Sequence, residues 1–181
     1  MIESEGNLEM RCFVGIPVSG EIADLCVELG RSASDGRPVP RENLHLTLQF
    51  LDEQPHDSLE ELHMQLDALR HPVFSIRVSG LGQFGQTLHV MVEPSSILQS
   101  LHDKVLACVR RSGIRVPHRR FRPHITVARG LKKCPSNDFL KQPITDCTMQ
   151  VAQFALFSST LHSSGARYET LADYQLLPGG T

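Results

Sequence analysis

The sequence predicts an α+β fold built from two similar halves. Segments with the apolar patterning of β-strands alternate with amphipathic helical segments, and a glycine-rich turn at 80–86 joins two strands directly. The order of these segments also repeats along the chain at a spacing of roughly 77 residues. We therefore expect one bilobal domain over 1–181, with matching strands across a shared cleft and a flexible N-terminal extension at 1–9.

The predicted strands either alternate between apolar and polar residues or are apolar throughout. They cover 11–17, 44–51, 73–80, 87–92, 123–129, 149–158 and 166–176. The second half repeats the first in the order of three strands, pairing 11–17 with 87–92, 44–51 with 123–129, and 73–80 with 149–158.

Apolar residues at helical spacing predict the helices, which cover 20–31, 58–70, 96–111 and a short segment at 135–141. Asp57-Ser58 and Pro94-Ser95 provide N-cap candidates for the second and third helices. Gly113 is expected to end the third helix, because glycine readily adopts the left-handed conformation of a C-terminal stop.

The composition excludes several classes of protein. The 181 residues are 40% hydrophobic and 21% charged, which is typical of a globular domain large enough to bury its own core. No apolar run approaches the length of a membrane span, and the acidic N-terminus does not resemble a signal peptide. The five cysteines form no C-x-x-C pair, so we expect reduced thiols in a cytoplasmic protein and no metal site. Because no hydrophobic stripe is left over once the core is assigned, we expect a monomer, and we expect no membrane contact and no cofactor.

Basic residues gather in one part of the chain. Between Asp103 and Asp138 there is no acidic residue, although that window carries ten basic residues, seven of them arginine. The arginine guanidinium matches the geometry of a phosphate group better than the lysine ammonium does. A solvated helix end with a charged loop would give the same pattern, so the charge alone does not establish a phosphate ligand.

Two copies of one short motif stand at corresponding strands of the two halves. The first is Leu44-His45-Leu46-Thr47-Leu48 and the second is Pro123-His124-Ile125-Thr126-Val127. Alternate residues of a strand share a face, so each histidine should point the same way as its threonine. By the same alternation Leu46, Leu48 and Phe50 should point to the opposite face. A single His-x-Thr would carry little information, but two copies at equivalent places favour a function.

Two imidazoles that face each other can act as a general base and a general acid near neutral pH. Threonine hydroxyls and a guanidinium can donate hydrogen bonds to an oxygen whose negative charge grows during the reaction. A phosphodiester fits this set: one histidine takes a proton from the attacking water and the other protonates the departing sugar oxygen. The motifs therefore predict a metal-independent phosphodiesterase.

The paired H-x-T-x motifs, about eighty residues apart, resemble those of the two-histidine phosphoesterases, and more narrowly the RNA 2',3'-cyclic phosphodiesterases, also named 2'-5' RNA ligases. Supporting stretches share this resemblance from about residue 10 to 177, and include 11–17, 43–51, 80–85, 122–129, 157–161 and 168–171. The resemblance implies two antiparallel sheets flanking a central cleft, with outer helices. It also implies hydrolysis of an RNA terminal 2',3'-cyclic phosphate, or of a cyclic nucleotide, to a 2'-phosphate, together with a reversible 2'-5' RNA ligase activity.

The resemblance also implies the roles of the site residues. His45 would be the proton donor to the leaving 3' oxygen, His124 the acceptor that activates water, and Thr47 and Thr126 would bind the non-bridging oxygens. Arg129 matches the family's arginine, but its odd offset from His124 places it on the opposite face unless the strand ends or bulges there.

The chain also departs from the family. It has no Trp, and His89 stands where relatives often carry one. His89 is expected to be structural or exposed, and His118 to contact the phosphate backbone. Phe13 and Tyr168 could stack on a base, although packing in the core is the simpler interpretation.

Three alternatives remain. One is a binding module for RNA or nucleotides that no longer turns over. Another is a related phosphodiesterase acting on ADP-ribose 1'',2''-cyclic phosphate or on 2'-5' oligonucleotides. A metallohydrolase is the third, but no H-E-x-x-H or carboxylate cluster supports it.

Overall fold

A computed structural model describes residues 9–33, 35–163 and 165–178, so most of the N-terminal extension expected at 1–9 lies outside the described residues. The helices in chain order are α1 (Gly20–Ser32), the 3-10 turn η1 (Arg41–Asn43), α2 (His56–Asp67), α3 (Ser96–Arg111) and α4 (Asn137–Lys141). The strands are β1 (Met10–Pro17), β2 (Arg37–Pro38), β3 (His45–Gln54), β4 (Phe74–Phe84), β5 (Thr87–Val92), β6 (His124–Arg129), β7 (Thr148–Val151), β8 (Gln153–His162) and β9 (Gly165–Gln175).

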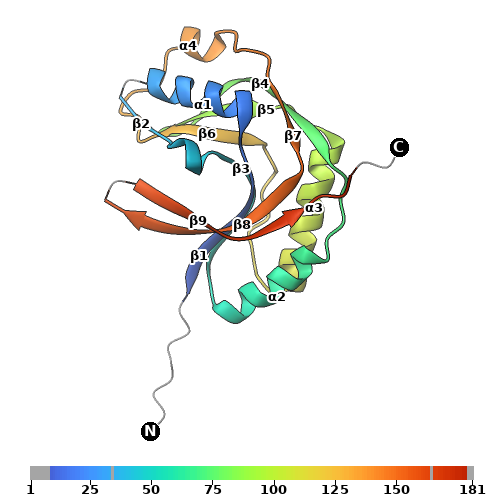
Figure 1. The fold of residues 1–181 in the computed structure, drawn as a ribbon. Helices are drawn as coiled ribbons and strands as arrows, with labels where there is room; N and C mark the ends of the chain where they lie inside the picture. The colour runs from blue at the N-terminus through green and yellow to red at the C-terminus, as the bar shows by residue number, and fades with distance from the viewer. Residues whose placement is uncertain (1–8, 34, 164, 179–181) are drawn as a thin grey trace.

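The strands form one curved sheet of nine strands, in which two antiparallel lobes lie side by side (Figure 1). Four strands of one lobe run in the order β7-β4-β5-β6, and those of the other in the order β3-β1-β8-β9. The short β2 is attached to β6. This arrangement confirms the predicted duplication, because β1, β3 and β8 occupy the places that β5, β6 and β4 occupy in the other lobe.

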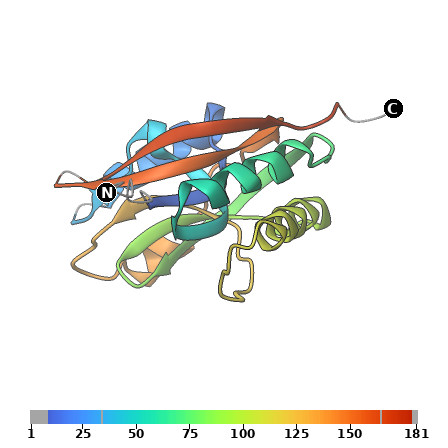
Figure 2. The ribbon, with the colours of Figure 1, turned by 90° about the horizontal axis from the view of Figure 1, so that it is seen from below.

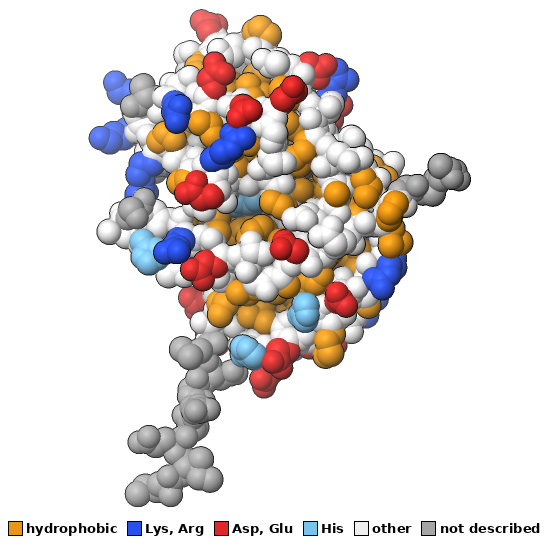
Figure 3. Space-filling view, viewed as in Figure 1, with side chains coloured by type: hydrophobic (Ala, Val, Ile, Leu, Met, Phe, Trp, Pro, Cys, Tyr) orange, Lys and Arg blue, Asp and Glu red, His pale blue; other side chains and the backbone are white. Residues whose placement is uncertain are grey.

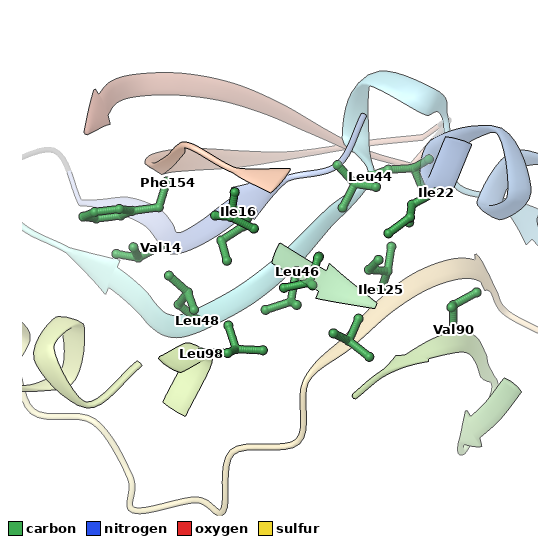
Figure 4. Close-up of a cluster of buried hydrophobic side chains, with 14 of the residues drawn as sticks. Val14, Ile16, Ile22, Leu44, Leu46, Leu48, Val90, Leu98, Ile125 and Phe154 are labelled. Atoms are coloured by element: carbon green, nitrogen blue, oxygen red, sulfur yellow. The ribbon is translucent and has the colours of Figure 1, made fainter. Parts of the chain in front are cut away.

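The two lobes are joined through a single antiparallel pair, Leu46 of β3 and Ile125 of β6. Both side chains are fully buried, and they point into the core together with Leu48 and Val90 (Figure 4). The centre of the sheet is therefore also the place where the two H-x-T motifs meet.

The helices cover the apolar face of the sheet. Helix α1 packs on β2, β6 and β7, whereas α3 packs on β3 and β4. Helices α2 and α3 lie side by side (Figures 1 and 2). Glycine at position 30 lets α1 approach β6 closely, since a Cβ there would lie 2.5 Å from the carbonyl oxygen of Val127.

Three predicted boundaries were wrong. The segment 149–158 divides at Ala152, because its first part pairs with β4 in one lobe and its second part with β1 in the other. The turn expected at 80–86 is confined to Gly85 and Gln86, since β4 continues to Phe84. Helix α2 begins at His56, so Ser58 lies inside the helix and is not its cap.

Candidate active site

The two motifs meet face to face at the junction of the lobes. Leu46 of β3 lies opposite Ile125 of β6, and the two strands run antiparallel. His45 therefore lies across from Thr126, and Thr47 lies across from His124. These four polar side chains share the sheet face opposite the core, so the predicted pairing of each histidine with its threonine leads to one four-membered cluster.

Both histidines are held by the same hydrogen bond. Nδ1 of His45 donates to the carbonyl oxygen of Asn43 over 2.7 Å, and Nδ1 of His124 donates to that of Arg122, also over 2.7 Å. A carbonyl oxygen can only accept, so in both rings the proton is on Nδ1 and the free lone pair of the neutral form is on Nε2. Each Nε2 is therefore the atom available for proton transfer.

A β-bulge follows the threonine in both strands. In β3 the bulge is at Leu48, since Gly15 pairs with Thr47 but Val14 pairs with Gln49. In β6 it is at Val127, the equivalent residue, which has no partner on β5. An extra residue reverses the alternation of side chains beyond it.

The bulges change the face of the residues that follow. Arg129 lies on the same face as His124 and Thr126, as its predicted role requires, and its side chain is exposed. The expectation that Phe50 points into the core was wrong, because the bulge at Leu48 turns it to the site face, where it is 50% exposed.

His45 lies in an aromatic surrounding. Its ring centroid is 4.5 Å from that of Phe13 and 5.1 Å from that of Tyr168, which approaches edge-on. Burial lowers the pKa of His45 to about 4, and the positive charges of Arg129 and His124 act in the same direction against the hydrogen bond to Asn43. His45 is therefore neutral at pH 7 in the unliganded chain.

His124 has a different surrounding, formed by Phe84 and His89. The two rings stack on each other with centroids 4.2 Å apart, and both meet the His124 ring, at 5.2 and 5.1 Å. His89 is 3% exposed, and its Nδ1 has no hydrogen-bond partner among the described residues. It fits beside the His124 ring because the residue that faces it on β4 is Gly82, where a Cβ would lie 2.4 Å from Nε2 of His89.

A cavity of about 460 Å³ opens on the side of β2 and the β8–β9 hairpin. It is next to His45 through Phe13 and Tyr168, the rings that surround this histidine, whereas the four motif residues themselves do not line it. Its lining combines aromatic rings with guanidinium groups, and includes Phe13, Phe50, Tyr168, Arg11, Arg37 and Arg129. Lys and Arg side chains gather along this side of the molecule (Figure 3). Arg37 lies directly opposite Arg129 in the sheet. Like charges in that arrangement repel each other, so the pair is suited to an anion that lies between them.

Sequence reasoning missed Arg37, Asn43 and Phe50. Asn43 supplies the carbonyl oxygen that holds His45, and its side-chain amide donates to the carbonyl oxygen of Ala166 over 2.8 Å. Its place two residues before the motif histidine is the signal that could have identified it. Arg37 and Phe50 could not be found in this way, because their positions depend on a two-residue strand and a bulge.

Other predicted features lie apart from this cluster. His118 is exposed in the segment between α3 and β6. All five cysteines are free thiols, and only Cys134 is exposed. The candidate metal ligands found among the described residues, His56, Asp57 and Glu60, lie exposed at the start of α2. Within the described part of the chain, none of the helices is long and apolar enough to span a membrane.

The chain is similar in sequence and fold to known proteins of one family. The family model of the 2'-5' RNA ligase superfamily matches residues 17–162. A Thermus thermophilus protein named RNA 2',3'-cyclic phosphodiesterase is 30% identical over 183 residues, covering 92% of this chain and 90% of its own length. The Escherichia coli protein of the same name is 28% identical over 172 residues, covering 92% and 96%. The crystal structure of E. coli LigT with 3'-AMP has a TM-score of 0.78 at 26% identity, covering 93% of this chain and 99% of that chain. The chain therefore belongs to the 2'-5' RNA ligase superfamily.

Proposed function

We propose that this protein hydrolyses the terminal 2',3'-cyclic phosphate of RNA to a 2'-phosphomonoester without a metal ion. The observation that carries the proposal is the convergence of two identically held imidazoles on one face of the sheet. The curated relatives in T. thermophilus and E. coli are both named RNA 2',3'-cyclic phosphodiesterase, which supports the same reaction class.

The proposed reaction uses the two Nε2 atoms on opposite sides of the phosphorus. Nε2 of His124 accepts a proton from water as the water oxygen bonds to phosphorus, and Nε2 of His45 donates a proton to the 3' oxygen as its bond to phosphorus breaks. The hydroxyl groups of Thr47 and Thr126 donate hydrogen bonds to the non-bridging oxygens. The Arg129 guanidinium binds the negatively charged phosphodiester through its non-bridging oxygens and holds it between the two imidazoles.

The low pKa of His45 determines when it can act as the donor. A group with a pKa of about 4 carries no proton on Nε2 at pH 7 in the free protein. The cyclic phosphodiester brings a negative charge close to Arg129 and both imidazoles, which favours the protonated form. We therefore propose that binding of the substrate itself loads His45 with the proton that it later donates.

A single chain supplies both motifs, so we propose that the protein acts as a monomer. The five free thiols, four of them buried, are consistent with a reducing compartment such as the cytoplasm. Sedimentation of the protein at micromolar concentration tests the first statement, and a mass that depends on concentration in this range would contradict it.

The direct test of the reaction is hydrolysis of 2',3'-cyclic AMP in excess EDTA, with the 2'- and 3'-monophosphates separated by chromatography. We expect the 2'-monophosphate, at a rate that EDTA does not change. Formation of the 3'-monophosphate would reverse the proposed leaving group. Binding of the nucleotide without turnover would favour the binding module, and turnover only of ADP-ribose 1'',2''-cyclic phosphate or a 2'-5' oligonucleotide would change the substrate.

A further inference from the structure

The segment that leads into the second motif is rich in arginine and carries no acidic residue. We call residues 115–122 the basic arm. It begins four residues beyond the end of α3 and ends two residues before His124. Its basic side chains are all exposed, and they are Arg115, Arg119, Arg120 and Arg122, with His118 between them.

Among the described residues, none of these arginines forms an ion pair with an acidic side chain. The ion pairs of arginine that the described residues do form all involve arginines outside the arm. Those pairs join Arg41 to Asp24, Arg77 to Glu93 and Asp146, and Arg167 to Glu169. The positive charge of the arm is therefore not neutralised by its own protein surroundings. A ligand with several negative charges is the partner that this arrangement favours.

The arm is fixed to the protein at three points. Ile114, just before the arm, is 4% exposed, and Val116 packs against the core. Near the other end, the ring of Phe121 stacks on that of His102 in α3, with centroids 4.2 Å apart. These contacts hold the backbone while the arginine side chains remain in solvent. Figure 2 shows this connection extending away from the end of α3 as an open loop.

The arm is also coupled to the site by the backbone. The carbonyl oxygen of Arg122, its last residue, accepts the hydrogen bond from Nδ1 of His124. A polymer whose terminal phosphate reaches His124 therefore has the arm directly beside it. None of the large apolar side chains that are exposed in the described chain lies in the arm, so it lacks the apolar anchors of a protein–protein interface.

From these observations we infer that the basic arm binds the RNA strand upstream of the cyclic phosphate, with its arginines on consecutive phosphate groups. This inference rests on the proposed function and adds to it a second contact surface, which binds the RNA strand beyond the reacting phosphate. Arginine suits this role because its guanidinium can bind two phosphate oxygens at once.

The test compares two substrates and two variants. The arm variant carries Arg115→Gln, Arg119→Gln and Arg120→Gln. It leaves Arg122 unchanged because its carbonyl oxygen holds His124. The control variant also loses three exposed positive charges, by Arg31→Gln, Arg70→Gln and Lys141→Gln, which lie on other parts of the surface. The substrates are 2',3'-cyclic AMP and a 12-nucleotide RNA that ends in a 2',3'-cyclic phosphate.

We expect the arm variant to keep its kcat/KM for 2',3'-cyclic AMP and to lose about 10- to 100-fold for the 12-nucleotide RNA at 0.1 M salt. The slope of log(kcat/KM) for the RNA against log salt concentration should become less negative by roughly 0.7 for each arginine that contacts a phosphate. The control variant should behave as the unmodified protein with both substrates. Equal salt dependence of the arm variant and the unmodified protein, or an equal loss in the control variant, would overturn the inference.

Binding of the same RNA, measured by fluorescence anisotropy, separates this inference from the proposed function. If the unmodified protein hydrolyses neither substrate, the proposed function fails. The arm is then still judged by whether the three substitutions weaken RNA binding and reduce its salt dependence. If hydrolysis of 2',3'-cyclic AMP proceeds but RNA binding is unaffected by the substitutions, only the inference about the arm fails.

Discussion

The imidazole of His45 shows how burial and hydrogen bonding can prepare one residue for proton transfer. Its Nδ1 is fixed by the carbonyl oxygen of Asn43, and its surroundings lower its pKa to about 4. His124 has the same hydrogen bond but a more open position. The two histidines are thus alike in orientation and different in environment, which is what a pair with opposite proton-transfer roles requires.

The pKa of His45 should rise when an anion occupies the site. The positive charges of Arg129 and His124 help to lower it in the free protein, and a phosphate group would offset both. The measurement is an NMR titration of the His45 ring, free and saturated with 3'-AMP. We expect a low pKa in the free protein and a clear increase in the complex. An unchanged pKa would contradict the role of His45 as the donor and favour it as the base.

Protonation of His89 should lower the free energy of unfolding of the protein at acidic pH. Burial lowers its pKa to about 4 in the folded state, so the unfolded chain binds more protons below about pH 6.5 and stability falls as the pH decreases toward 4. Replacing His89 by Phe removes this group and keeps a ring beside Phe84. We expect the loss of unfolding free energy between pH 7 and pH 5 to be smaller by about 1–2 kcal/mol in His89→Phe, measured by urea denaturation.

His118→Phe is the matched control, because His118 is exposed on the basic arm. The loss of stability in acid should be the same in this variant as in the unmodified protein. An identical loss in His89→Phe would show that His89 does not resist protonation in the folded state.

At the scale of the elements, the bulges in β3 and β6 determine which of the side chains that follow them face the site. The alternation rule places the His/Thr pairs correctly from sequence, because each pair precedes its bulge. It fails for Phe50 and leaves Arg129 undecided, because an extra residue reverses the faces and no residue type marks it unambiguously. The catalytic candidates could therefore be predicted from the sequence, whereas much of the lining of the cavity could not.

Arg129 should contribute mainly to binding of the phosphate. Arg129→Ala removes a guanidinium that faces the site, so we expect KM for 2',3'-cyclic AMP to rise by roughly 10- to 100-fold, in line with the loss of a hydrogen bond to a charged group. Lys132→Ala, three residues further and exposed, should leave KM unchanged. An unaltered KM and kcat in Arg129→Ala would remove this residue from the site.

The N-cap of α3 provides a test of the elements themselves. The hydroxyl of Ser95 accepts a hydrogen bond from the backbone N–H of Leu98 over 3.3 Å, as expected for a cap, whereas Ser58 lies inside α2. Ser95→Ala should reduce the free energy of unfolding by about 1 kcal/mol. Ser58→Ala should change it much less, since no cap is lost. Equal effects in urea denaturation would contradict this assignment of the helix ends.

At the scale of the whole molecule, the internal repeat was the most informative part of the sequence. It identified corresponding strands in two lobes and thereby brought His45 and His124 into one site. The division of 149–158 at Ala152 was not predictable, because the apolar pattern is continuous while its two parts pair with strands of different lobes. Local periodicity specifies the strands, and the partner of each strand is set only by the assembled sheet.

The central claim is that residues from the two lobes act together in one chemical step. The measurement that tests it most directly is the kcat for 2',3'-cyclic AMP of His45→Ala, His124→Ala and the double variant, with unfolding curves to confirm that each is folded. We predict a loss on the order of 10²–10⁴ in each single variant. The double variant should lose far less than the product of the two, since one proton transfer is of little use without the other. Losses that multiply independently, or a single variant with normal kcat, would contradict a shared step.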